Sequence, residues 1–203
     1  AFRQGEDIHR KTAAVVFGVD PEAVTSEMRR QAKVFNFGIL YGMGAFGLAQ
    51  AADIDQKEAG KFIEAYFDRF SGVAKYLEAS KVFAREHGYV ETELGRRRSV
   101  PEIQSHNVQV ARSGERMAVN MPVQGLAADI MKLAMIAADR LVIERYDETV
   151  VMLLQVHDEI IFEVREDVAL DFAKDLKEAM ETVYTLKVPL AVDVASGKNW
   201  GEV

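Results

Sequence analysis

Two apolar runs that flank the tripeptide His157-Asp158-Glu159 constrain the fold of this 203-residue chain more than any other feature. Residues 150–156 and residues 160–164 each have the length and apolar content of a buried strand. A short polar segment between two such runs favours a β-hairpin. The pattern therefore predicts two adjacent carboxylates at the tip of a hairpin, held there by apolar strands.

Carboxylate oxygens at such a tip suit Mg²⁺, which keeps several waters and binds one or two carboxylates together with substrate phosphates. This arrangement serves phosphoryl transfer by two metal ions. The residues alone leave three other interpretations open: an ordinary polar turn, a His-Asp metal phosphohydrolase, and an iron site with two histidines and one carboxylate. Both metal alternatives need further histidines, and the remaining ones are His9, His87 and His106.

A second pattern combines cations and rings at a spacing of four, in Arg29, Lys33, Phe37 and Tyr41. Each step of four residues turns a helix by about 40° beyond a full turn, so the four side chains form one stripe. Cations can hold a polyphosphate, and a ring can stack on a base or a sugar. The stripe predicts a nucleoside triphosphate site on a helix at residues 26–41. The alternative is an amphipathic helix whose rings belong to the core.

Two weaker signals point to nucleic acid. Arg116, Asn120 and Gln124 also step by four, and such side chains can reach phosphates and the minor-groove acceptors of base pairs. Arg96 and Arg97 lie in a run of three arginines that could grip phosphates. A solvated helix face and an ordinary surface loop are the alternatives.

The charge balance argues against a nucleic-acid binder, because the formal net charge is −7. The charge is uneven, however. Residues 1–116 carry 17 Lys and Arg against 16 Asp and Glu, whereas residues 117–203 carry 8 against 16. The absence of cysteine excludes disulfides, thiolate metal sites and a cysteine nucleophile. No apolar run approaches the roughly 18 residues of a spanning helix, so we expect no membrane partner.

Taken together, these segments resemble the family A DNA polymerases. Residues 29–42 (RRQAKVFNFGILYG) are similar to that family's fingers-helix motif, residues 155–159 to its palm hairpin motif, and residues 116–124 to its template–primer motif. Residues 7–13 resemble the stretch after the first palm motif. The similarity covers essentially the whole chain, in the expected order.

The resemblance implies a role for each matching residue. Asp158 and Glu159 would bind Mg²⁺, of which the complete enzyme holds two ions, and Lys33 would supply a proton to the leaving pyrophosphate. The side chains that would bind the incoming dNTP are Arg29, Lys33, Phe37 and Tyr41. Those that would contact primer–template DNA are Arg116, Asn120, Gln124, His157, Tyr41, Arg96 and Arg97.

The expected fold is α+β and mostly helical. Residues 1–108 would form a fingers subdomain with a small hairpin near residues 89–100, and residues 109–203 the C-terminal part of a palm with a short antiparallel sheet. The thumb, the first palm motif and any exonuclease domain are expected before residue 1. We therefore expect the chain alone to have little or no polymerase activity.

The implied protein is a monomeric DNA-directed DNA polymerase of the bacterial cytoplasm, acting in replication and repair. Two other functions stay open: a non-catalytic nucleic-acid or nucleotide binding module, and a structural helical domain with an acidic surface. Periodicity also predicts a helix at residues 106–120, a break at Pro122, a second helix at residues 125–145, and a last strand at residues 188–194.

Overall fold

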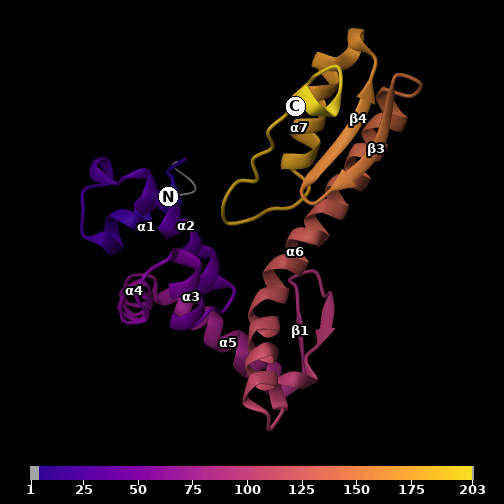
Figure 1. Cartoon of the computed structure of the whole chain (residues 1–203). Coiled ribbons are helices and arrows are strands. Elements are labelled where there is room, and N and C mark those ends of the chain that lie inside the picture. Colours follow the sequence, from indigo (N-terminus) through magenta and orange to yellow (C-terminus); the bar gives the residue numbers. More distant parts are fainter. Residues whose placement is uncertain (1–4, 203) are drawn as a thin grey trace. The chain divides into compact units, whose positions relative to one another are not determined.

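The computed structural model describes residues 5–202, so the first four residues of the predicted fingers region lie outside the described range. The helices are α1 (Ile8–Phe17), α2 (Ser26–Leu40), α3 (Ala45–Ala52), α4 (Gln56–Arg69), α5 (Ser71–His87), α6 (Val108–Arg145) and α7 (Ala169–Glu181). The strands are β1 (Tyr89–Glu91), β2 (Arg97–Ser99), β3 (Val150–Val156) and β4 (Glu159–Val164) (Figure 1). The chain forms two compact units, and the first ends at Leu126.

The first unit contains α1 to α5, and three of these helices, α1, α2 and α4, start at side-chain caps. The Asp7 carboxylate accepts hydrogen bonds from the first backbone N–H groups of α1, and Thr25 and Asp55 cap α2 and α4 in the same way. The apolar faces of these helices meet in one core cluster, whose most buried large side chains are Phe35, Ile39 and Leu48. This packing leaves the opposite face of α2 to solvent.

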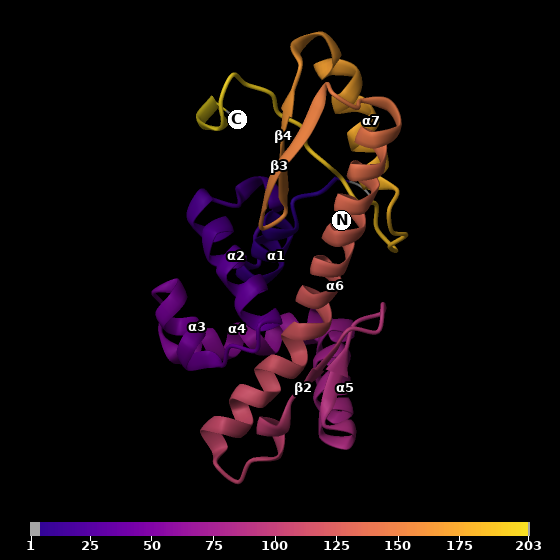
Figure 2. The same ribbon diagram turned by 90° about the vertical axis from the view of Figure 1, so that its right-hand side faces the viewer.

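The predicted hairpin near residues 89–100 is present as β1–β2, and it lies beside α5 and the amino-terminal part of α6 (Figure 2). Gly114 allows α6 to pass close to the short 3₁₀ turn Pro101–Gln104. A Cβ atom at Gly114 would lie only 2.7 Å from the Cα of Ile103 and 2.8 Å from the carbonyl carbon of Glu102. Only glycine fits this crossing.

The predicted break at Pro122 is wrong, because α6 runs through 38 residues without interruption. Proline has no N–H, so the carbonyl of Ala118 loses its usual partner, at a cost of about 3 kcal/mol. The helix is held on both sides of the proline. Ala118 and Met121, which precede the proline, pack in one buried cluster. Ala138, which follows the proline, packs in another. Tertiary packing therefore outweighs the local helix-breaking signal.

In the second unit, β3 and β4 pair antiparallel with Val156 opposite Glu159, and the register shifts between Met152 and Leu154. Phe162 of β4 packs on Phe172 of α7 with their ring centroids 5.1 Å apart. Only one face of this two-stranded sheet is covered. The prediction that both apolar runs are buried is wrong, because three side chains of β3 are more than two-fifths exposed: Val151, Leu153 and Leu154.

The predicted last strand at residues 188–194 is also wrong, since no strand forms there within the described part of the chain. The side chains of residues 188–193 alternate between half-buried and exposed, as the sequence pattern requires, but Val194 is exposed like Asp193. Both backbone polar groups of Val192, however, bond to side chains of α7. Lys177 Nζ donates to the Val192 carbonyl at 2.7 Å, and the Val192 N–H donates to Glu181 at 2.9 Å.

Within residues 5–202, no helix is both long enough and apolar enough to cross a membrane.

Candidate functional site

The cation-and-ring stripe lies on the solvent-facing side of α2. Arg29 and Lys33 are exposed, and Tyr41 follows the last helical residue as the C-cap. Phe37 is 43% and Tyr41 38% exposed, so neither ring belongs to the core, to which α2 contributes Phe35 and Ile39 instead. Their ring centroids lie 6.1 Å apart at an interplanar angle of 24°. The stripe thus offers two cations and two near-parallel rings to a ligand.

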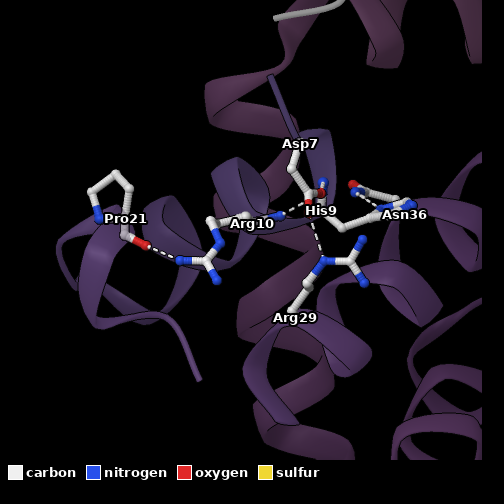
Figure 3. A network of polar contacts seen from close by, with 6 residues as sticks. All are labelled: Asp7, His9, Arg10, Pro21, Arg29 and Asn36. Atoms are coloured by element: carbon white, nitrogen blue, oxygen red, sulfur yellow. Dashed lines mark hydrogen bonds and ion pairs between the residues drawn. The ribbon is translucent and has the colours of Figure 1, made fainter. Parts of the chain in front are cut away.

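Helix α1 adds Asp7 to this stripe (Figure 3). Arg29 Nε donates to Asp7 Oδ2 at 2.6 Å, while Asp7 Oδ1 accepts from the backbone N–H of His9 at 2.9 Å. The hydrogen bond from Arg29 holds the pKa of the Asp7 carboxyl below its usual range. Asp7 therefore fixes Arg29 and the start of α1 at the same time.

The second residue that α1 contributes is His9, whose ring lies 5.6 Å from the Phe37 ring. Asn36 Nδ2 lies 3.0 Å from His9 Nδ1, and Thr12 Oγ1 donates to Asn36 Oδ1 at 3.1 Å. Figure 3 shows His9 between Asn36 and the Asp7–Arg29 pair. No role could be predicted for Asp7 and His9 from the sequence, because contacts between separate helices leave no local pattern.

Burial is the main reason that the His9 imidazole stays neutral. Burial lowers its pKa most, Asp7 opposes this by raising the pKa, and the cations Arg29 and Lys33 lower the pKa further. Because the ordinary pKa of histidine is about 6.5, a lowered value leaves the ring uncharged at neutral pH. The ring is therefore a single donor and a single acceptor in this site.

The turn between α2 and α3 joins the stripe to the predicted DNA-contacting face of α6. Gly42 has a φ of 74°, and a Cβ atom there would lie 3.0 Å from Arg116 Cγ. Arg116 is exposed and makes no ion pair with any carboxylate among residues 5–202. Further along α6, the Oδ1 atom of Asn120 is buried and lacks a hydrogen-bond partner in the described structure, and Gln124 is exposed. Tyr41 and Arg116 therefore border one surface.

Arg96 and Arg97 of the β1–β2 hairpin lie in different surroundings. Arg97 Nε donates to Glu91 Oε2 at 2.8 Å, and its guanidinium lies 4.6 Å above the Tyr89 ring. Arg96 passes close to α6, because a Cβ atom at Gly125 would lie 3.7 Å from its Cδ atom. The structure therefore brings Arg96 next to the helical segment that carries Gln124, whereas Arg97 is held within its own hairpin.

The second unit carries the predicted acidic tip. His157 and Asp158 form a two-residue turn between β3 and β4, and His157 has a φ of 53°, a conformation that non-glycine residues adopt at a cost of about 1–2 kcal/mol. Gln155 Nε2 donates to the His157 carbonyl across the turn. His157, Asp158 and Glu159 are all exposed. The hairpin therefore presents both carboxylates to solvent on a turn with a defined backbone.

The two carboxylates fit a magnesium ion in part. Neither Asp158 nor Glu159 forms an ion pair or a side-chain hydrogen bond within the described residues, so their oxygens are available. Mg²⁺ commonly takes only one or two carboxylates and completes its shell with water and phosphate. In the part of the chain that the structure describes, no three His, Asp or Glu side chains gather in a way that could enclose a metal ion.

The sequence model of DNA polymerase family A matches residues 1–202. The chain belongs to DNA polymerase family A. It is 48% identical over its whole length to DNA polymerase I of Pseudomonas aeruginosa and 50% identical over 99% of its length to the thermostable DNA polymerase I of Thermus filiformis. It spans 22% and 24% of the length of these two curated relatives.

A solved family A structure has the same fold. It is the POL domain of Pol1 from M. smegmatis in complex with DNA primer-template and dNTP. The TM-score is 0.92 at 45% identity, and the match covers 98% of this chain and 35% of that one. The resemblance predicted from the motifs and the mostly helical α+β fold are therefore confirmed.

Proposed function

We propose that this chain holds the incoming dNTP and the primer–template in a DNA-directed DNA polymerase that extends primer 3′-hydroxyls in replication and repair. Family membership and the dNTP and primer-template named for the M. smegmatis relative support this proposal. The chain spans about a fifth of the length of its P. aeruginosa relative. The activity is therefore assigned to the whole polymerase.

The observation that carries the proposal is the exposed stripe on α2. Arg29 and Lys33 would bind the triphosphate, Phe37 would pack on the sugar, and Tyr41 would close the pocket over the templating position. Lys33 forms no ion pair within residues 5–202, so its ammonium group is free to bind phosphate. From the same position it would donate a proton to the leaving pyrophosphate.

Primer–template DNA would lie along α6 and the two hairpins. The side chains proposed to contact it are Arg116, Asn120, Gln124, Tyr41, His157, Arg96 and Arg97. The contact between Gly42 and Arg116 supports a shared border between the nucleotide and the DNA, because it joins the end of the stripe to α6. Arg97 would first have to release Glu91.

Asp158 and Glu159 would bind Mg²⁺, with Glu159 as the less essential ligand, and two such ions would act in the complete enzyme. Bound Mg²⁺ supplies positive charge that stabilises the negative charge developing on phosphate oxygens during transfer. Two carboxylates alone are few for two ions. We therefore propose that further ligands come from outside the described residues and that the chain by itself has little or no activity.

The subdomain assignment also stays a proposal, with fingers at residues 1–108 and palm at residues 109–203. The compact units divide at Leu126, within α6, whereas the proposed boundary places this helix almost wholly in the palm. We further propose a monomer that acts in the bacterial cytoplasm.

The experiment that tests the proposal measures dNTP and primer–template affinity for Lys33→Ala, with Lys61→Ala as a matched control. Lys61 is an exposed lysine on α4 that makes no ion pair within residues 5–202. Loss of one charged hydrogen bond costs about 1.5–3 kcal/mol, so Lys33→Ala should weaken dNTP binding by about tenfold or more. Duplex binding should change little, and Lys61→Ala should change neither.

Equal losses of dNTP and duplex affinity in Lys33→Ala would contradict the role of the stripe. A chimera that carries this chain in place of the matching segment of the P. aeruginosa polymerase tests turnover. Primer extension by the chimera would support the polymerase. Salt-dependent DNA binding without extension would instead favour a non-catalytic binding module.

A further inference from the structure

Asn36 is a buried polar residue in the middle of α2, with 7% of its surface exposed. A buried amide that lacks partners costs about 1–3 kcal/mol, so its hydrogen bonds decide whether the residue is tolerated. Both side-chain partners of Asn36 lie on α1, at Thr12 and His9. Neither contact follows from the periodicity of α2, which would place an apolar side chain at this buried position.

The proton positions in this network follow from the orientation of the Asn36 amide. The Thr12 hydroxyl donates to the Asn36 amide oxygen at 3.1 Å, so the amide nitrogen faces His9 Nδ1 at 3.0 Å. An amide nitrogen only donates, and His9 Nδ1 must therefore accept. In a neutral imidazole with a lone pair on Nδ1, the single N–H is on Nε2.

We propose that Asn36 is a positioning residue of the nucleotide site, which holds the His9 imidazole so that its Nε2–H donates to the triphosphate bound by Arg29 and Lys33. The inference rests on the proposed function of the stripe on α2. His9 is only half-buried and lies beside Phe37, so one edge of the ring is open to a ligand there. Asn36 itself touches no substrate.

The orientation of the Asn36 amide determines whether His9 Nε2 presents an N–H group or a lone pair to the triphosphate. With the amide reversed, its oxygen would accept from His9 Nδ1–H, and Nε2 would present a lone pair to the phosphate oxygens. The charged groups that face His9 are Arg29 and Lys33 from α2 and Asp7 from the start of α1. Their combined effect, with burial, favours the uncharged ring, in which the choice between the two nitrogens matters.

The first test reads the proton position directly, in a ¹H–¹⁵N spectrum of the His9 ring of the nucleotide-free 203-residue chain at neutral pH. We expect an unprotonated Nδ1 and a protonated Nε2. Asn36→Asp has the same shape but can only accept, so it should place a proton on Nδ1 while still accepting from Thr12. A protonated Nδ1 in the unmodified chain, or ring nitrogens that Asn36→Asp leaves unchanged, would overturn the proposal.

The second test asks whether Asn36 acts on the nucleotide through His9. Asn36→Leu should raise the Kd for dNTP by about tenfold, as expected for one hydrogen bond to a charged group. In a His9→Ala background, the same change should have almost no further effect. Equal losses in both backgrounds would show a merely structural role and overturn the proposal. Thermal unfolding of each variant checks that it is folded.

The two tests separate this inference from the proposed function. The proton on His9 is read without nucleotide, so it is decided even if the stripe binds no dNTP. Failure of the unmodified chain to bind dNTP would contradict the proposed function and the role of His9 in it. Normal dNTP binding together with a protonated Nδ1 would instead overturn only the positioning role of Asn36.

Discussion

Gly42→Ala is the substitution that most sharply tests how the nucleotide stripe meets α6. Gly42 lies between α2 and α3 in the left-handed region, with a φ of 74°. An added Cβ would lie 3.0 Å from Arg116 Cγ, closer than ordinary contact between carbon atoms. The substitution therefore strains the backbone and pushes on a proposed DNA-binding side chain at the same time.

The expected magnitude follows from three contributions. Alanine in the left-handed region costs about 1–2 kcal/mol. Alanine also lowers the conformational entropy of the unfolded chain, which stabilises the folded state by about 0.4–1 kcal/mol. Displacement of the flexible Arg116 side chain adds a smaller cost. We expect Gly42→Ala to lower the free energy of unfolding by about 1 kcal/mol, which multiplies the unfolding constant by about five.

Urea unfolding measures this effect, and Gly47→Ala is the matched control. Gly47 lies in α3, where an added Cβ would meet only Met43 Cγ at 3.9 Å. Alanine is favoured over glycine in a helix by about 0.5–1 kcal/mol, so this variant should be more stable than the unmodified chain. Opposite signs for two glycines five residues apart are the expected result. An unchanged or higher stability for Gly42→Ala would refute the argument.

Two further predictions use the same measurement. Gly114→Ala should destabilise the chain by about 1–3 kcal/mol, because the new methyl group meets the backbone at Ile103, whereas Gly60→Ala in an open position should be stabilising. Asp7→Asn keeps an N-cap but loses the charge that pairs with Arg29. Because the folded-state pKa of Asp7 is lowered, its stabilisation is complete above its ordinary pKa of about 4 and is lost as the pH falls through the lowered value. The stability difference between the unmodified chain and Asp7→Asn should therefore shrink in acid, and a constant difference would contradict the ion pair.

The stripe on α2 could be predicted from the sequence because a helix makes its backbone hydrogen bonds within itself. Its faces then follow from spacing alone, and the exposed positions of Phe37 and Tyr41 agree with that prediction. Helix α1 carries similar local signals, with a capping Asp7 before it and Gly18 in the left-handed region after it. No helix was predicted at residues 8–17 from these signals, and they carry no information on the contacts of α1 with α2.

The contacts of Asp7 and His9 could not be predicted, since they join positions 22 and 27 residues apart in the chain. Nothing in the local pattern of α1 says which face of α2 it meets. The continuity of α6 could not be predicted for a related reason. Pro122 acts locally, whereas the packing that holds the helix on both sides involves residues distant in sequence.

The strands show what an alternating pattern leaves undetermined. Alternation assigns side chains to two faces, but a strand also needs a partner for its N–H and C=O groups. The β3–β4 hairpin obtains that partner through a two-residue turn, so the place of Asp158 and Glu159 at the tip could be predicted from the sequence. Residues 188–194 have the alternation without an adjacent partner, and side chains of α7 satisfy the backbone at Val192 instead. The strand predictions for this chain thus hold where the pairing partner is adjacent in sequence and fail where no such partner exists.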